Sequence, residues 1–327
     1  MLAEKKEQQQ EKLLEVNGLK KYFTTGSSVG TKNYIKAVDD LSFFIYGGET
    51  LGVVGESGCG KSTMGRTVLR LQNPTEGETF FDGENINHYS KRKLRELRKE
   101  VQMIFQDPYG SLNQRMTVGA MLSEVVRTHK IVPKKDTVSY IQGLLQDVGL
   151  NPEHYWKYPH EFSGGQRQRI SIARALAVKP KLIVCDEAVS ALDVSVQAQV
   201  LNLLQKLKKE YQLTYLFISH DLSVVKHISD RVAVMYLGQI VELADKHDLY
   251  KKPLHPYTQA LLSAIPTVGS EKKKERVILE GDVPSPMNIP QGCRFHTRCP
   301  LAKEHCKVKA PEWREVEEGH FVACHEV

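Results

Sequence analysis

The chain has 327 residues, 41% of them hydrophobic, which is enough to bury one large core and a smaller second unit. Its 45 basic and 39 acidic residues give a net charge of +6, but the basic residues are dispersed among acids without interleaved aromatic residues, which argues against a nucleic-acid-binding protein. There is no apolar leader and no run of about eighteen apolar residues, so the sequence predicts a cytoplasmic chain that reaches a membrane only through a partner.

The order of apolar runs predicts an α/β core that is interrupted by helices. Runs typical of strands lie at 13–16, 18–23, 41–46, 50–54, 101–105, 182–185, 213–218 and 232–236. Between Gln106 and His160 the pattern turns helical, which predicts an inserted helical subdomain at about 107–160. After 265 the composition changes to a charged and then a proline-rich stretch. We therefore predict a polar tail at 1–12, a core at 13–264 and a C-terminal extension at 265–327.

A glycine-rich loop follows the apolar run at 50–54 and precedes a stretch with helical spacing. Glycines let successive amide groups converge on an anion, and the N-terminus of the helix adds partial positive charge. Lys61 adds a full charge, and the Ser62 hydroxyl can ligate a Mg²⁺ that bridges the outer phosphates. The sequence thus predicts a polyphosphate-binding P-loop rather than a turn without a ligand. Its residues are Gly55, Glu56, Ser57, Gly58, Cys59, Gly60, Lys61, Ser62 and Thr63.

A second polar helix start lies at residues 163–166, with the sequence Ser-Gly-Gly-Gln. The helix predicted to follow, at 166–178, has Ile170, Ala173 and Ala177 on one face. Such a start can bind a second anion, although the glycine pair is also compatible with a simple N-cap.

Two further strand ends carry polar side chains suited to phosphoryl transfer. Asp186 and Glu187 follow the run at 182–185, and successive strand residues face opposite ways. Asp186 can therefore hold Mg²⁺ while Glu187 points toward an attacking water. His220 follows the run at 213–218, from which it can hydrogen bond a γ-phosphate and the water. Beside a P-loop, these residues favour a catalytic interpretation over a solvated turn and a structural histidine.

These motifs, in this order, resemble those of the ATP-binding-cassette (ABC) family. The stretch 162–169 is similar to the family signature, although Phe162 stands where Leu is more common. The resemblance covers about residues 13–260. It implies a P-loop NTPase (RecA-like) cassette of the α/β class, with an antiparallel β subdomain and an inserted α-helical subdomain, that hydrolyses ATP with Mg²⁺. The other matching motifs are the P-loop, Gln106 within 105–108, the pair Asp186 and Glu187, the run 190–193 and His220.

The resemblance also implies the roles of individual catalytic residues. Glu187 would be the general base, His220 the switch histidine, and Gln106 the sensor of Mg²⁺ and of the attacking water, with Lys61 at the phosphates. The implied Mg²⁺ ligands are Ser62, Gln106 and Asp186.

Other implied roles concern a second cassette and the adenine base. The signature residues would act on the γ-phosphate held by the opposite cassette of a head-to-tail dimer, and Asp193 would communicate between the two sites. Phe23 would stack on adenine, with Tyr22 as the adjacent alternative. The implied signature residues are Ser163, Gly165 and Gln166.

Finer features resemble the ATPases of oligopeptide/dipeptide permeases, and among them the F-type subunit. The stretches that carry this resemblance are 36–39, 65–71, 106–113 and 255–262. It implies a related D-type ATPase as partner, with a homodimer possible in isolation, beneath two membrane-spanning permeases fed by an extracytoplasmic peptide-binding protein. The chain would lie at the cytoplasmic face of the membrane, and a permease helix would dock on about 107–116.

Other functions stay open at this point. Within transport, the cargo could be nickel chelates or oligosaccharides instead of peptides, because the ATPase does not touch the cargo. A soluble ABC ATPase outside transport would normally have tandem cassettes or a coiled-coil insertion, and this chain has neither. A non-hydrolysing regulatory binder would be expected to lack Glu187 or His220.

Six cysteines divide into two groups. Cys59 and Cys185 are most simply packing residues. The other four are spaced C-x5-C-x6-C-x17-C in a segment too polar to form its own core. Disulfides are disfavoured in the cytosol, so a metal site is the better interpretation. These four are Cys293, Cys299, Cys306 and Cys324.

The identity of the metal is less constrained than its ligands. Zinc suits four thiolates, but its usual short Cys spacings are absent. Permease ATPases of this type resemble the chain in carrying such a quartet, which implies a [4Fe-4S] cluster, and Cys299-Pro300 is similar to ferredoxin ligation. Zinc and unligated thiols remain alternatives. Histidines that keep a mixed zinc site open are His296, His305, His320 and His325.

Overall fold

The computed structural model describes residues 11–25, 33–265 and 279–327. The predicted polar tail at 1–12 thus lies outside the described residues, except for Glu11 and Lys12. Within the described ranges, no helix combines the length and the hydropathy that crossing a membrane requires.

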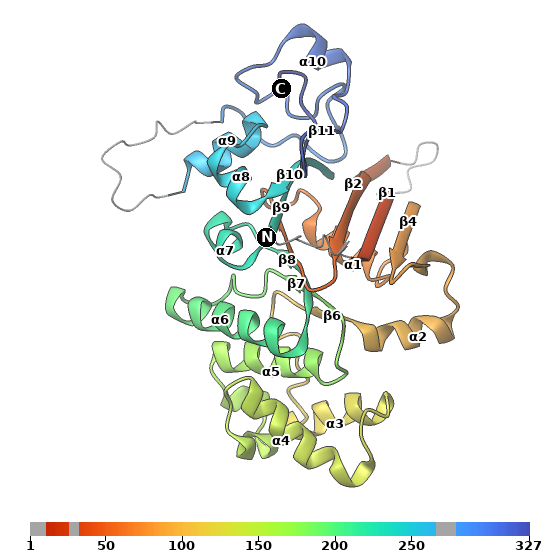
Figure 1. Ribbon diagram of the computed structural model, residues 1–327, viewed down its shortest axis with the longest axis vertical. Coiled ribbons are helices and arrows are strands. Elements are labelled where there is room, and N and C mark those ends of the chain that lie inside the picture. Colours follow the sequence, from red (N-terminus) through yellow and green to blue (C-terminus); the bar gives the residue numbers. More distant parts are fainter. Residues whose placement is uncertain (1–10, 26–32, 266–278) are drawn as a thin grey trace, which may run out of the picture.

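A mixed sheet of eight strands forms the centre of the molecule (Figure 1). Five strands pair in parallel in the order β9-β3-β8-β7-β6, and β10, β12 and β11 continue the sheet antiparallel beyond β9. Every residue of β3, β7 and β8 is buried, as expected for parallel strands covered on both faces. The bounds are β3 (Thr50–Val54), β6 (Val101–Ile104), β7 (Leu182–Asp186), β8 (Thr214–Ile218), β9 (Arg231–Tyr236), β10 (Gln239–Asp245), β11 (Arg314–Glu317) and β12 (His320–Val322).

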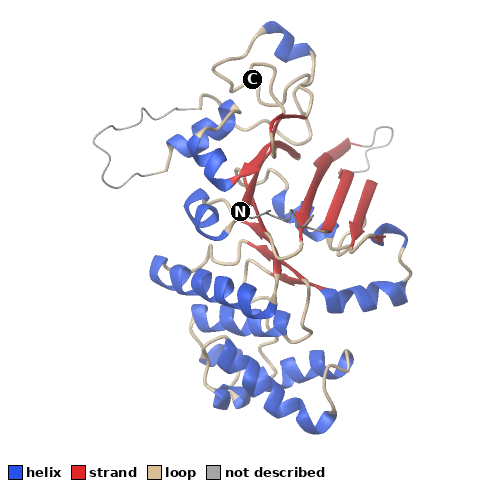
Figure 2. Cartoon of the chain, viewed as in Figure 1, coloured by secondary structure: helices blue, strands red, loops and turns tan. Residues whose placement is uncertain are grey.

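A smaller antiparallel sheet lies to one side of the central sheet (Figure 2). Its strands follow the order β2-β1-β4-β5, so the expected antiparallel β subdomain is present. The bounds are β1 (Lys12–Thr25), β2 (Asn33–Tyr46), β4 (Glu76–Phe81) and β5 (Glu84–Asn85).

Helices cover the sheets and gather at one end of the molecule (Figure 2). The predicted helical insertion contains α3 (Val118–Thr128), η2 (Lys134–Asp136), α4 (Thr137–Asp147), η3 (Pro152–Trp156) and η4 (Pro159–Glu161). The remaining helices are α1 (Lys61–Val68), η1 (Ile86–His88), α2 (Lys91–Glu100), α5 (Gly164–Leu176), α6 (Val194–Tyr211), α7 (Leu222–Ile228), α8 (Lys246–Lys251), α9 (Pro256–Ser263) and α10 (Glu304–Val308).

Two hydrophobic cores meet at the central sheet, and β8 serves both. Tyr215 and Phe217 face the core shared with α5 and α6, whereas Leu216 and Ile218 face the core shared with the small sheet. This alternation follows from the two-residue period of a strand. The carboxyl ends of the parallel strands are thereby fixed between two packed layers.

The C-terminal extension contributes a hairpin to the central sheet, which the sequence did not predict. Strand β12 pairs with β10, and His320 hydrogen bonds the Glu242 carboxylate across 2.8 Å, with both side chains buried. The same carboxylate accepts the backbone N–H groups of Leu254 and His255. A segment too polar to form its own core thus shares the core of the main body.

Candidate nucleotide site

The P-loop lies between β3 and the N-terminus of α1, where two glycines have no room for a side chain. The φ angles of Gly55 and Gly60 are 155° and 105°. A Cβ on Gly55 would lie 2.1 Å from the carbonyl oxygen of Met235, and one on Gly60 would lie 2.0 Å from that of Ala37. Only glycine fits these positions, so the loop keeps its amides turned toward the start of the helix.

Lys61, the first residue of α1, lies buried beneath this loop. Its ammonium donates to the carbonyl oxygens of Gly55, at 2.7 Å, and Glu56, at 2.9 Å. Burial raises the pKa of the neighbouring Cys59 thiol, which supports the prediction that Cys59 is a packing residue.

Ser57 and Gly58 form the exposed rim of the loop, and Ser62 and Thr63 are half-buried in the first helical turn. The arrangement can surround a phosphate with amides and one ammonium group.

Asp186 and Ser62 form the pair expected to hold Mg²⁺. The Ser62 hydroxyl donates to Asp186 across 2.6 Å, and the Arg66 guanidinium lies 3.5 Å from the other carboxylate oxygen. Burial raises the pKa of Asp186, and the Ser62 hydrogen bond and the charge of Arg66 oppose this increase. A buried carboxylate beside a hydroxyl is an oxygen ligand set that suits Mg²⁺. These residues fit the predicted ion.

Three predicted catalytic side chains meet at the carboxyl ends of neighbouring strands. Gln106 follows β6, Glu187 follows β7 and His220 lies just after β8. The Gln106 amide donates to Glu187 Oε2 across 2.8 Å, and His220 Nδ1 lies 3.3 Å from the same oxygen. Glu187 has a φ of 48°, a left-handed turn that bends the chain immediately after Asp186. The two acids thus serve different parts of the site.

The signature residues begin α5, as predicted, but the helix starts earlier than the expected 166. Ser163 is the N-cap and exchanges hydrogen bonds with Gln166, its hydroxyl accepting from the Gln166 amide and its amide donating to the Gln166 side chain. A Cβ on Gly165 would lie 2.4 Å from Val196, so this glycine permits close packing on α6. Asp193 caps α6 by accepting the Val196 N–H at 2.9 Å.

The two predicted phosphate-binding helix starts do not meet within one chain. Helix α5 packs against α3, α4, α6 and β6, whereas α1 packs against β1, β2, β7 and β8 (Figure 1). A site that contains both would therefore need a second cassette.

Comparison with known proteins agrees with this geometry. Residues 38–190 match the family model of the ABC transporter, and residues 241–306 match that of the oligopeptide/dipeptide transporter, C-terminal region. Oligopeptide transport ATP-binding protein AppF of Bacillus subtilis is 56% identical over 97% of this chain and 98% of its own length. OppF of the same species is 54% identical over 97% of each chain. The chain belongs to the ABC transporter ATP-binding proteins of the oligopeptide family.

Solved structures extend the likeness to the cassette fold. The ATP-binding cassette MJ0796, in a dimeric structure bound to ADP and Pi, has a TM-score of 0.62 and 26% identity, covering 71% of this chain and 98% of that chain. CbiO1 from Clostridium perfringens has a TM-score of 0.63 and 26% identity over 74% of this chain and 91% of its own. The protein is therefore an ABC cassette that binds ATP with Mg²⁺ and hydrolyses it.

Phe23 and Tyr22, the two candidates for adenine stacking, have different surroundings in this ABC protein. The Tyr22 hydroxyl hydrogen bonds Asp39, and the Lys36 ammonium lies 5.4 Å from its ring centre. Phe23 is half-buried, with the Lys21 ammonium 5.0 Å from its ring centre. Because Tyr22 is held by a carboxylate, Phe23 remains the predicted stacking residue.

The four C-terminal cysteines of the ABC protein lie close together. Burial raises the pKa values of the Cys293, Cys299 and Cys324 thiols, and the other thiols of the group are near enough to add a smaller increase to each. Three of the thiols accept a backbone N–H from the residue two positions later: Cys293 from Phe295, Cys299 from Leu301 and Cys324 from Glu326. The backbone N–H of Cys293 also donates to the carbonyl oxygen of Cys306, at 2.8 Å.

The spread of these thiols bears on the metal that they can hold. A single tetrahedral zinc, with Zn–S bonds of about 2.3 Å, needs sulfurs about 3.8 Å apart. Among the described residues, the group of three ligand atoms within 4.8 Å of one another is His305, Cys306 and Glu326, not a set of three thiols. His320, a candidate for a mixed zinc site, is instead bound to Glu242. Among the described residues, the thiols therefore do not form the compact set that a single zinc ion requires.

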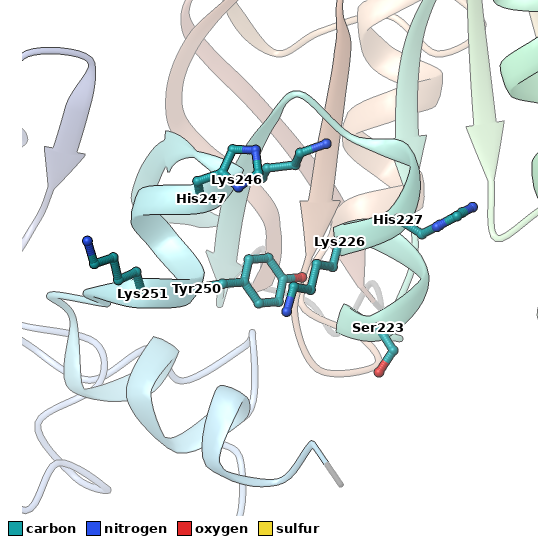
Figure 3. A pocket seen from close by; sticks show the side chains of 7 residues that line it. All are labelled: Ser223, Lys226, His227, Lys246, His247, Tyr250 and Lys251. Atoms are coloured by element: carbon teal, nitrogen blue, oxygen red, sulfur yellow. The ribbon is translucent and has the colours of Figure 1, made fainter. Parts of the chain in front are cut away.

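A basic hollow of about 740 Å³ lies between α7 and α8 (Figure 3). The Lys226 ammonium lies 5.2 Å from the Tyr250 ring centre, and the Tyr250 hydroxyl donates to the Leu222 carbonyl. These two contacts attach α8 to α7, the helix that follows His220. The lining residues are Ser223, Lys226, His227, Lys246, His247, Tyr250 and Lys251.

Sequence reasoning missed two residues that support the P-loop. Arg298 binds the Glu56 carboxylate through two hydrogen bonds, and the Tyr257 hydroxyl accepts the Glu56 N–H at 3.0 Å. Tyr257 lies in the stretch 255–262, which carried the subfamily resemblance, and that motif was the available signal. Arg298 had no signal except its position beside Cys299.

Proposed function

We propose that the protein is the ATP-hydrolysing subunit that powers import of dipeptides and oligopeptides across the cytoplasmic membrane. The assignment of hydrolysis depends on one observation: Gln106 and His220 both contact the Glu187 carboxylate beside the P-loop. The transport assignment is supported by relatives named as oligopeptide transport ATP-binding proteins that match nearly the whole chain.

The chain's residues divide the reaction between binding and proton transfer. The loop amides and Lys61 hold the triphosphate and balance its negative charge. Ser62 and Asp186 would hold Mg²⁺, which would supply further positive charge at the outer phosphates. Glu187 accepts a proton from the water that attacks the γ-phosphorus, and ADP leaves as phosphate forms. Gln106 and His220 hold the carboxylate of Glu187 in place.

The separation of α1 and α5 supports a head-to-tail dimer in which each ATP joins the P-loop of one cassette to the signature of the other. Ser163, Gly165 and Gln166 would then contact the γ-phosphate, and Asp193 would lie near both sites. We propose a related D-type ATPase as the natural partner, with a homodimer in isolation. ATP binding closes such a dimer, and product release lets it open.

Membrane partners follow from the same assignment. Two permease subunits would carry the peptide, delivered by an extracytoplasmic binding protein, and the ATPase would lie at the cytoplasmic face of the membrane. The stretch 107–116 is the proposed permease contact. Its Tyr109 is 52% exposed, and the Arg167 guanidinium lies 5.0 Å from its ring centre. A tail at 1–12, a cassette at 13–264 and an extension at 265–327 remain our proposed division.

Uptake by the assembled transporter tests the function. Vesicles that contain both ATPases and both permeases are supplied with binding protein, ATP and labelled peptide, and uptake is compared with that of a nickel chelate and an oligosaccharide. We expect ATP-dependent uptake of peptide alone, and none with a Glu187→Gln subunit. Uptake of nickel or sugar without peptide would replace the peptide assignment, and ATP hydrolysis without any uptake would favour a soluble ATPase.

We further propose that Cys293, Cys299, Cys306 and Cys324 hold a [4Fe-4S] cluster that fastens the extension. Support comes from the proximity of all four thiols, the backbone N–H donors of three of them, and the lack, among the described residues, of three thiols within 4.8 Å of one another. Hydrogen bonds from amides to sulfur are a usual feature around such clusters. Zinc is the alternative that this geometry favours less.

Metal analysis of protein purified without oxygen distinguishes a [4Fe-4S] cluster from zinc. We expect about four irons and four acid-labile sulfides per chain, with broad visible absorption, as the cluster requires. Cys306→Ser should lose both, whereas Cys59→Ser, which alters a thiol outside the quartet, should keep them. Stoichiometric zinc with no sulfide would contradict the cluster.

A further inference from the structure

The carboxylate of Glu56, in the P-loop, is bound by an arginine from the C-terminal extension. The Arg298 guanidinium makes two parallel contacts, of 2.7 Å to one carboxylate oxygen and 3.1 Å to the other. The arginine side chain is only 7% exposed, and that of the glutamate is 27% exposed. A forked, mostly desolvated pair fixes direction as well as charge.

The surroundings of Arg298 hold it rigidly. Its backbone N–H donates to the carbonyl of Phe295 at 3.0 Å, and the Phe295 ring packs against Tyr236 and Tyr257 with ring centres 5.3 and 5.4 Å apart. Four residues earlier, Arg294 binds Asp39, the carboxylate that Tyr22 also contacts. The segment 293–299 is therefore bound to the cassette by two ion pairs, Arg294–Asp39 and Arg298–Glu56.

Every polar group of Glu56 has a fixed partner. Its carboxylate binds Arg298, its N–H donates to the Tyr257 hydroxyl at 3.0 Å, and its carbonyl accepts from Lys61 at 2.9 Å. Moving the Glu56 side chain would thus disturb the backbone on which the Lys61 ammonium rests. Without Arg298, the glutamate would also leave an unbalanced negative charge at the loop, where it would repel a triphosphate.

We propose that Arg298 is a positioning residue for ATP binding that acts through Glu56. The C-terminal extension is then a structural part of the nucleotide site, and a disturbance of segment 293–299 lowers ATP affinity. The inference rests on the proposed function of the P-loop as the ATP site.

A double-mutant cycle on the full chain tests it. The variants are Arg298→Gln, Glu56→Gln and the double variant, and the readouts are the equilibrium Kd for Mg-ATP and the KM and kcat of hydrolysis. We expect Arg298→Gln to raise Kd and KM about tenfold, as loss of one partner of a partly buried charge pair does, with kcat at saturating ATP within about twofold. Glu56→Gln should have a smaller effect, and the double variant should recover most of the affinity because no unbalanced charge remains.

A matched control lies in the same extension, just after the segment 293–299. Lys303→Gln breaks the Lys303–Glu326 pair, at 2.5 Å, which does not touch the P-loop. It should leave Kd unchanged. Arg298→Lys keeps the positive charge but cannot make both hydrogen bonds to Glu56, so it should give an intermediate Kd. This variant also replaces Arg298→Gln in the test if Arg298→Gln does not fold.

The outcomes separate the possible failures. Additive effects of the two single variants, or equal Kd values for Arg298→Gln and Lys303→Gln, would overturn the positioning role. A loss of melting temperature in Arg298→Gln that the double variant does not reverse would assign Arg298 to stability alone. Failure of the unaltered protein to bind ATP would instead overturn the proposed function.

Discussion

Glu187→Gln will still bind Mg-ATP but will hydrolyse it at least about a hundredfold more slowly. Removal of a general base typically costs this much or more. Glutamine has nearly the same shape, and its carbonyl oxygen can still accept the Gln106 amide that now contacts Glu187 at 2.8 Å. It cannot, however, accept a proton from water. ATP should therefore accumulate in the bound state and hold the dimer closed.

Single-turnover hydrolysis and size-exclusion chromatography with ATP measure both effects. Glu210→Gln is the matched control, because Glu210 forms an exposed pair with Lys206 on α6, at 3.5 Å. It should hydrolyse ATP normally and form no trapped dimer. Unimpaired hydrolysis by the Glu187→Gln transporter would exclude Glu187 as the base.

Lys61→Ala will act on binding instead. We expect the Kd for Mg-ATP to rise by about a hundredfold, because the change removes a charge-assisted contact worth roughly 1.5–3 kcal/mol. The Lys61 ammonium is buried and is held at the loop by two carbonyl oxygens, so a cation from solvent cannot easily take its place.

Equilibrium titration with a fluorescent ATP analogue gives the Kd, and a thermal melt shows whether the fold survives. Lys93→Ala is a suitable control, since Lys93 forms an exposed pair with Glu84 on the small-sheet side. If Lys61→Ala bound ATP as tightly as Lys93→Ala, the phosphate-binding assignment of the P-loop lysine would be wrong.

The nucleotide site could be predicted because each of its parts carries a local signal. The glycines of the P-loop mark backbone that no other residue can adopt, and their φ angles bear this out. Glu187 and His220 each follow an apolar run, so their place at the carboxyl ends of strands could be read directly. That Gln106 and His220 both reach the same carboxylate oxygen of Glu187 depends on the strand order β8-β7-β6, which the apolar runs alone do not specify.

The features that were missed depend on contacts between distant residues. Arg298 and Glu56 are 242 residues apart, and although each lies beside a motif, neither motif indicates that the two side chains meet. Strand β11 has three charged residues out of four and β12 is only three residues long, so no alternating apolar pattern marks them. His320 was an open candidate for zinc because it lies among cysteines, yet its partner is Glu242 on β10.

The pairing of Glu56 with Arg298 also sets an order of events during synthesis. The P-loop leaves the ribosome 242 residues before the arginine that holds it. At about 5–20 residues per second, that interval is on the order of ten to fifty seconds. Through this time the nascent cassette carries a glycine-rich loop whose glutamate has no counter-charge. The ATP site thus reaches its final form late in translation, after the rest of the parallel sheet has been made.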